Sequence, residues 1–210
     1  LTLVLRHIPG MVDPLPGHRG WAVLVELSDS VPDPRLATLL EDELSVASSE
    51  GWVTDAALAS SLAQTEALWA LRENISEAQK VEGVSIKHDI SVPVSRIPAF
   101  LEAAELALRR DCPDVRIVAF GHLGDGNLHY NLSRLGELDN RDFQSRAGVV
   151  SRIVHDLVAA HGGSISAEHG IGQLKREELG RYKSPIELEL MRGIKQTLDP
   201  LGLMNPGKVL

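Results

Sequence analysis

The sequence predicts an α+β fold in which helices pack on an antiparallel sheet. Short apolar runs rich in β-formers alternate with longer stretches whose apolar residues recur at helical spacing. A Gly-Asp-Gly turn joins two of the short runs, as in a β-hairpin. GxGxxG and P-loop patterns are missing, so a nucleotide-binding fold is not expected. The order of elements also allows two ferredoxin-like βαβ halves.

The first half of the chain is predicted to contain strands at residues 21–27 and 52–56 and helices at residues 32–49 and 60–79. The run WAVLVEL at the first strand is almost entirely apolar, which is typical of a buried strand. Residues 32–34 (PDP) open the first helix, and leucines follow at helical spacing. Ser60 and Ser61 are N-cap candidates for the second helix.

The second half is predicted to contain strands at residues 84–92, 115–120 and 128–132 and helices at residues 95–108, 142–160 and 184–198. Ser95 caps the first of these helices, and Gly162 ends the second. The last helix opens with SPIE, a capping box with proline at the first helical position. Residues 164–168 are expected to be extended.

Composition limits the partners and the compartment. The formal net charge of −8 argues against a nucleic-acid partner, because no basic stripe is available to neutralise phosphates. Cys112 is the single cysteine, which suits a reducing compartment, so we expect a cytoplasmic protein. No apolar run approaches the roughly 20 residues that span a bilayer. Residues 1–20 are expected to end an element truncated upstream, and residues 21–210 to form one domain.

Two segments concentrate the side chains that carry chemistry. The run GHLGDGNLH places His122 and His129 on either side of a glycine-rich turn, and the run SAEHG adds Glu168 and a third imidazole. Two histidines and one carboxylate make a three-ligand site for a divalent transition metal. Because such a site leaves coordination positions open for water or substrate, whereas structural sites are closed, the pattern predicts a catalytic metal site.

Glu168 is assigned to the metal and His169 to proton transfer, because imidazole suits a general base near working pH. Neighbouring side chains of an extended segment point to opposite faces, so both residues serve one site only if the chain turns there. The glycines that follow make such a turn feasible. Asp125, between two glycines, is assigned to the turn backbone rather than to a fourth metal ligand.

Arg72, Ser76 and Lys87 are candidates for binding a substrate carboxylate. Arg72 and Ser76 lie one helical turn apart, and Lys87 lies in a predicted strand. A guanidinium and an ammonium that converge on one pocket would hold a carboxylate. From spacing alone, solvated charges on amphipathic elements explain these residues better.

The other histidines are expected to have no part in catalysis. His88 follows Lys87 and should face the opposite way, in a structural role. Four more are expected at the surface: His7, His18, His155 and His161.

Three motifs in this order, GHLGDGNLH, SAEHGIGQLKREEL and DPLGLMNPGKVL, resemble the C-terminal half of the FAD-linked oxidases of the vanillyl-alcohol oxidase type. The similar branch contains D-lactate, D-2-hydroxyglutarate and glycolate dehydrogenases. The stretches LRENISEA and SIKHDISVP match as well, so the resemblance covers residues 21–210. The family's FAD-binding domain precedes this region and is not represented in the chain.

The resemblance implies oxidation of a D-2-hydroxy acid to a 2-keto acid, with hydride passed to FAD. It implies zinc or manganese on His122, His129 and Glu168, and His169 as the base. It further implies substrate contacts from Arg72, Ser76, Lys87 and Asn131, and we assign Asn205 and Lys208 to the flavin. Ser76 stands where a threonine is common in the 2-hydroxyglutarate branch, which keeps the hydroxyl but loosens the substrate identity.

Two other functions stay open at this stage. One is a flavin-independent, metal-dependent hydrolase or lyase that uses metal-activated water. The other is a non-catalytic module that serves in assembly. The sequence does not choose among the hydroxy acids, identify the downstream electron acceptor, or decide whether the protein is a homodimer.

Overall fold

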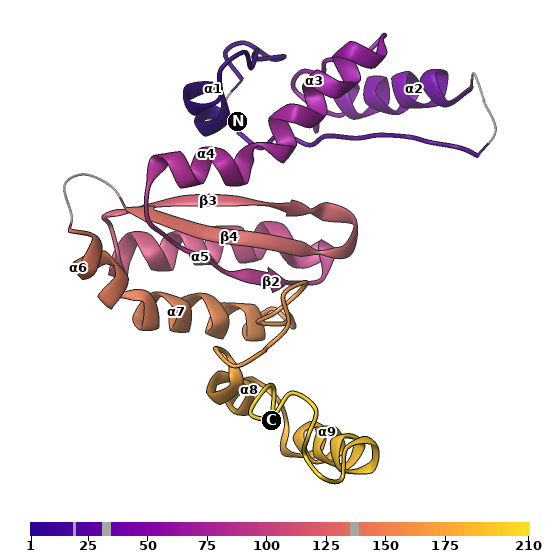
Figure 1. Cartoon of the computed structure of the whole chain (residues 1–210). Helices are drawn as coiled ribbons and strands as arrows, with labels where there is room; N and C mark the ends of the chain where they lie inside the picture. The colour runs from indigo at the N-terminus through magenta and orange to yellow at the C-terminus, as the bar shows by residue number, and fades with distance from the viewer. Residues whose placement is uncertain (19, 31–34, 135–138) are drawn as a thin grey trace. The chain divides into compact units, whose positions relative to one another are not determined.

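The computed structural model describes residues 1–18, 20–30, 35–134 and 139–210 (Figure 1). The chain divides into two compact units, Leu1–Gly83 and Val84–Leu210. Helices and an open antiparallel sheet make up the described residues, which confirms the α+β prediction. Their single sheet does not confirm two ferredoxin-like halves. None of the described helices is both long enough and apolar enough to cross a membrane.

The first unit is helical, with α1 (Thr2–His7), α2 (Arg35–Ser49), α3 (Leu62–Glu73) and α4 (Ile75–Glu82). Its small core consists of Val4, Leu71 and Ala78 and the apolar residues around them. The helix predicted over residues 60–79 is interrupted at Asn74. The backbone N–H and the side-chain amide of Asn74 both donate to the carbonyl of Ala70 in the last turn of α3.

The prediction of a buried strand at residues 21–27 is wrong. This segment belongs to no strand, and Trp21 and Val23 are 66% and 65% exposed. Residues 52–56 form no strand either. All the described strands lie in the second unit. The apolar β-formers of residues 21–27 therefore have no described strand of their own unit to pair with. The prolines predicted to open the first helix, at residues 32–34, lie outside the described residues.

The sheet of the second unit is built around one central strand. Its strands are β1 (Ser85–Ile86), β2 (Asp89–Ser91), β3 (Val115–His122) and β4 (Asn127–Arg134). β4 pairs antiparallel with each of the other three. The strand predicted over residues 84–92 is interrupted before Asp89, because the N–H of His88 donates to the side-chain oxygen of Asn131, at 3.2 Å.

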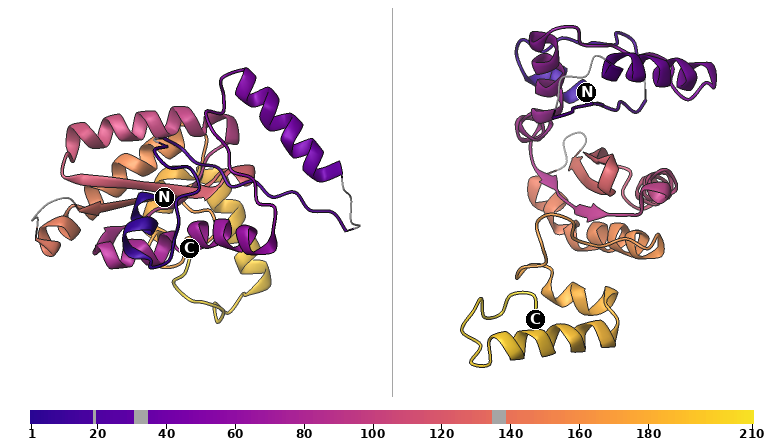
Figure 2. Two further views of the ribbon diagram at one scale, coloured as in Figure 1. Left: turned by 90° about the horizontal axis from the view of Figure 1, so that it is seen from above. Right: turned by 90° about the vertical axis from the view of Figure 1, so that its right-hand side faces the viewer.

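Two long helices, α5 (Ile97–Asp111) and α7 (Ala147–Ala160), lie side by side against one face of this sheet (Figures 1 and 2). Leu128, Tyr130 and Leu132 of β4 point into the core beneath them. Because side chains alternate along a strand, residues 127, 129, 131 and 133 lie on the opposite face. One face of β4 therefore stabilises the unit, and the other carries polar side chains.

The remaining elements of this unit are η1 (Val94–Arg96), η2 (Leu123–Asp125), α6 (Asn140–Ser145), α8 (Arg176–Tyr182) and α9 (Pro185–Leu198). The helix predicted over residues 142–160 corresponds to α6 and α7, which meet at Arg146. The predicted capping box at the start of α9 is confirmed, with Ser184 and Glu187 each accepting from the other's backbone. No residue of α9 is buried.

Candidate active site

The hairpin of β3 and β4 positions the two predicted metal-binding histidines. In its register His122 pairs with Asn127 and Phe120 with His129, so both histidines lie on the polar face of β4. Asp125 accepts the backbone N–H of Asn127 at 3.0 Å, which confirms its role in the turn. The tight turn thus brings His122 and His129 from two strands to one side of the sheet.

Gly126 is required at the end of the turn. Its φ is +75°, and a Cβ on it would lie 2.0 Å from the carbonyl oxygen of Val92. Gly124 has no positive φ, and a Cβ there would meet nothing within 4 Å. The turn therefore depends on only one of its two glycines.

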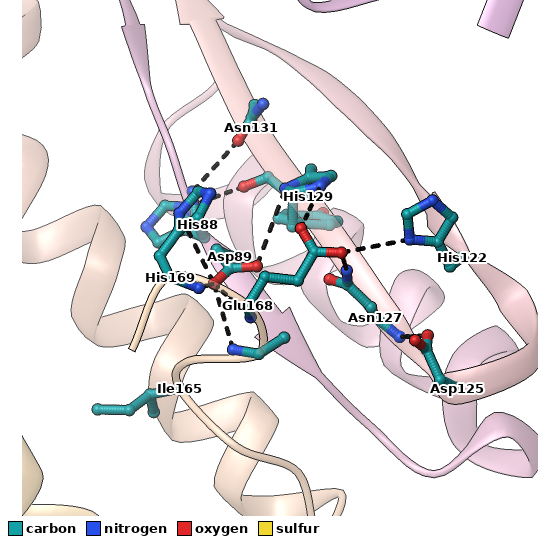
Figure 3. A network of polar contacts seen from close by, with 12 residues as sticks. His88, Asp89, His122, Asp125, Asn127, His129, Asn131, Ile165, Glu168 and His169 are labelled. Carbon is teal, nitrogen blue, oxygen red and sulfur yellow. Dashed lines mark hydrogen bonds and ion pairs between the residues drawn. The ribbon is translucent and has the colours of Figure 1, made fainter. Parts of the chain in front are cut away.

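Glu168 lies between the two histidines (Figure 3). Its Oε1 is 3.3 Å from Nδ1 of His122, and its Oε2 is 3.7 Å from Nε2 of His129. The side-chain amide of Asn127 donates to Oε1 at 2.5 Å. The structure therefore brings together the three residues predicted to hold a metal. The side chains of His122 and Glu168 are 60% and 46% exposed, so the site opens to solvent.

The sequence reasoning missed Asp89. Its Oδ2 accepts three consecutive backbone N–H groups, from Ala167 at 3.2 Å, Glu168 at 3.0 Å and His169 at 2.8 Å. These three bonds confirm that the chain turns at this point, as a shared site for Glu168 and His169 requires. The signal in the sequence was the only carboxylate of the strand predicted over residues 84–92, two positions after Lys87.

Asp89 also belongs to a group of potential ligands. One ligand atom each from Asp89, His129 and Glu168 lies within 4.8 Å of the others. The side chain of Asp89 is 3% exposed, and its Oδ1 accepts no hydrogen bond from the part of the chain that the structure describes. Imidazole nitrogens and carboxylate oxygens suit zinc or manganese. The donor set and the unpartnered buried oxygen therefore fit a divalent metal.

His169 lies at the open edge of this cluster. Its side chain is 69% exposed, its Nδ1 is 3.7 Å from Oδ2 of Asp89, and its ring centre is 6.0 Å from that of His129. An exposed imidazole next to the ligand cluster can exchange a proton with a bound molecule.

Lys175 holds together the segments that carry the site. Its Nζ donates to the carbonyl of Ile165 at 2.6 Å and to that of Asp89 at 3.4 Å. Burial lowers the pKa of Lys175, and Asp89 and Glu178 oppose this shift. The bonds connect β2 to the loop before Glu168, which helps to fix that loop against the sheet.

The residues predicted to bind substrate and flavin belong to several elements of the two units. Lys87 is exposed at the break between β1 and β2, whereas Asn131 is 5% exposed and bonded to the backbone of His88. Arg72 lies in α3 and Ser76 in α4, both in the first unit. Asn205 and Lys208 lie in the C-terminal tail, where Nζ of Lys208 donates to Gln173 at 2.9 Å.

His88 has the structural role predicted for it. It is 2% exposed, its Nδ1 lies 2.8 Å from the carbonyl oxygen of Tyr130, and its Nε2 lies 3.1 Å from Oγ of Ser151. Because a carbonyl only accepts, Nδ1 carries a proton. Burial, opposed by the bond to Tyr130, lowers its pKa to about 4.

The surface position predicted for His155 is wrong, because this residue is 1% exposed. It lies on the buried face of α7 with Val150, Val154 and Val158, a spacing that the sequence contained. Its Nδ1 is 2.9 Å from Oε2 of Glu178. Burial first, and then the charge of Lys175, lower its pKa to about 4.

Comparison with known proteins shows to which family this chain belongs. Residues 1–209 match the family model described as FAD linked oxidases, C-terminal domain. A D-2-hydroxyglutarate dehydrogenase of Stutzerimonas stutzeri (strain A1501) is 43% identical over 160 residues, covering 76% of this chain and 34% of that protein. The mitochondrial D-2-hydroxyglutarate dehydrogenase of Arabidopsis thaliana is 36% identical over 211 residues, covering 100% of this chain and 36% of that protein. The corresponding mitochondrial protein of Bos taurus is 38% identical over 191 residues, covering 90% and 33%.

The chain spans about a third of the length of these relatives. The family match, by contrast, extends over nearly all of its own residues and includes both halves of the histidine-glutamate cluster. The chain belongs to the FAD linked oxidases, as a member of their C-terminal domain family.

Proposed function

We propose that the protein oxidises a D-2-hydroxy acid to the 2-keto acid, and that this chain supplies the metal and proton-transfer half of the active site. The observation that carries this proposal is the position of Glu168 between His122 and His129, with His169 beside it. The family supports FAD as the cofactor. The names of the relatives make D-2-hydroxyglutarate the first substrate to test, with D-lactate and glycolate after it.

In this proposal His122, His129 and Glu168 hold zinc or manganese. A bound divalent metal supplies a Lewis acid that lowers the pKa of the substrate hydroxyl. FAD supplies the acceptor for the hydride. His169 takes the hydroxyl proton, and its exposure at the edge of the cluster gives its ring access to a bound hydroxy acid. The chain itself therefore contributes binding, orientation and the base.

Arg72, Ser76, Lys87 and Asn131 are proposed to hold the substrate carboxylate, with Arg72 giving the bidentate contact. Lys87 is exposed and lies two positions before Asp89 in the chain, which supports its part in this site. Fixing the carboxylate decides which face of the substrate carbon is presented.

Asn205 and Lys208 are proposed to contact the flavin. The tail that carries them bonds to the loop after His169, because the N–H of Val209 donates to the carbonyl of Gly172 at 2.7 Å. This proximity supports a shared location for the base and the cofactor. The chain spans about a third of the length of its relatives, and we assign the rest of the flavin site to residues outside this chain.

We also propose that a separate acceptor takes the electrons from the reduced flavin, that the protein forms a homodimer, and that it lies in the cytoplasm. The net charge of −8 continues to argue against nucleic acid as a partner. A cytoplasmic location is weakened by the relatives of Arabidopsis thaliana and Bos taurus, whose names place them in mitochondria.

Turnover and flavin reduction by the protein at its full natural length test this function. We expect flavin bleaching by a D-2-hydroxy acid without oxygen, and a loss of turnover of about 100-fold or more in His169→Ala with the metal content unchanged. Near-normal turnover of His169→Ala contradicts the assigned base. Metal-dependent turnover without flavin reduction would favour the hydrolase or lyase, and no effect of Glu168→Ala would favour the assembly module.

A further inference from the structure

We infer that Asp89 is a positioning residue of the metal site, which holds the proton of His129 on Nδ1 so that Nε2 is the atom offered to the metal. The inference rests on the proposed function, because it states how one of the proposed ligands is oriented. Asp89 is not among the residues that the sequence predicted for the site.

The two ring nitrogens of His129 face two different carboxylates (Figure 3). Nδ1 is 3.9 Å from Oδ1 of Asp89, and Nε2 is 3.7 Å from Oε2 of Glu168. A neutral imidazole carries its proton on one nitrogen and offers a lone pair on the other. Since Glu168 also lies next to His122, two of the proposed ligands gather near Nε2, whereas Nδ1 is the ring nitrogen that faces Asp89.

Asp89 has one carboxylate oxygen to give to this ring. Its Oδ2 is occupied by three backbone N–H groups, whereas its Oδ1 is buried and accepts no hydrogen bond from any described residue. A buried oxygen in that position is costly unless a donor satisfies it. The 3.9 Å separation exceeds a hydrogen bond, and closing it by about 1 Å gives Nδ1–H a bonding distance to Oδ1.

The carboxylate of Asp89 therefore acts on the loop that carries Glu168 and also on the ring of His129. Through Oδ2 it fixes the backbone of Glu168 and His169, and through Oδ1 it sets the tautomer of His129. Carboxylates in this position commonly orient metal-binding histidines, and their loss costs about 10- to 100-fold in metal affinity. The competing arrangement makes Asp89 itself a ligand, with Nδ1 facing the metal and the proton on Nε2.

Asp89→Asn separates the two functions of the carboxylate. Its amide oxygen can still accept the backbone N–H groups, while its amide nitrogen would donate to Nδ1 of His129. The proton of His129 would then move to Nε2, which could no longer bind a metal. Asp199→Asn is the matched control, because Asp199 is also buried and accepts backbone N–H groups, from Leu203 and Met204.

The test is NMR of the protein at its full natural length with ¹⁵N-labelled histidine, the signals of His129 being assigned with His129→Gln. We expect a protonated Nδ1 in the wild type, and a shift of the Nε2 signal when Zn²⁺ is added. Asp89→Asn should move the proton to Nε2 and weaken Zn²⁺ binding by about 10- to 100-fold. Asp199→Asn should change neither the His129 tautomer nor the affinity.

An unprotonated Nδ1 in the wild type overturns the inference, and this measurement needs no variant to fold. An Asp89→Asn protein with the wild-type tautomer and affinity overturns it as well. If the wild type binds no Zn²⁺ but His129 still holds its proton on Nδ1, the result contradicts the proposed metal and supports the proposed action of Asp89 on the His129 tautomer.

Discussion

The side-chain amide of Asn127 donates a 2.5 Å hydrogen bond to Oε1 of Glu168 across 41 positions of sequence. Asn127 is buried at the start of β4, and Asp125 holds its backbone N–H. The turn that separates the two histidines thus also provides the donor that orients the carboxylate. The hairpin and the loop after α7 are fixed to each other at the point where the chemistry is proposed.

Replacing Asn127 by alanine should weaken metal binding by about 10-fold, because Glu168 loses the donor that orients it. Titration with Zn²⁺ or Mn²⁺ measures the effect. Ser133→Ala is the matched control, since Ser133 is also buried on the polar face of β4 and pairs in register with Ser85 and Arg116. Equal affinities in Asn127→Ala and the wild type would contradict this role.

The two glycines of the turn should respond differently to alanine. In Gly126→Ala the new Cβ meets the carbonyl oxygen of Val92 in a left-handed backbone, so we expect a loss of about 2 kcal/mol or more in the free energy of unfolding. Gly124→Ala should change it by less than about 1 kcal/mol, because its Cβ meets open space. Denaturant unfolding measures both, and similar losses would contradict the described turn.

Two buried histidines should make the free energy of unfolding depend on pH. The pKa values of His88 and His155 are lowered to about 4, mainly by burial, whereas the unfolded chain binds these protons near pH 6.5. Both rings are neutral in the folded and the unfolded chain above pH 6.5, so they add no pH dependence there. As the pH falls from about 6.5 to about 4, the unfolded chain takes up protons that the folded chain does not. The free energy of unfolding should therefore fall by up to about 1.4 kcal/mol per histidine and pH unit.

Denaturant unfolding between pH 7 and pH 5 measures this slope before most carboxylates titrate. His155→Leu should reduce it by about half, because one of the two histidines is removed. A slope that stays the same in His155→Leu contradicts the assignment.

The parts of the fold that the sequence predicted are those with a local physical cause. The turn of residues 123–126 and the capping box at Ser184 depend on residues a few positions apart, and both are confirmed. The predicted strand at residues 21–27 was wrong because a strand also needs a neighbouring backbone, which apolar composition does not specify. Alternation along the strand predicted the structural role of His88 correctly, whereas His155 is buried because it shares the helical spacing of three buried valines.

The sequence predicted the proposed metal ligands of the candidate site but not the residues that orient those ligands. His122, His129 and Glu168 stand out because few residue types bind transition metals. Asp89 acts on backbone N–H groups 78 to 80 positions away, and any loop has such groups, so no pattern in the sequence marks the partner. Asn127 was missed because the carboxylate that it orients, that of Glu168, is 41 positions away in the sequence.

Metal content is the measurement that tests the central claim most directly. Elemental analysis follows loading of the protein at its full natural length with Zn²⁺ or Mn²⁺, with His122→Ala and Glu168→Ala alongside the wild type. Three ligands on one ion predict about one metal per chain in the wild type and a loss of that metal in both variants. A wild type without specific metal, or variants that keep the wild-type content, would contradict a metal centre on these residues.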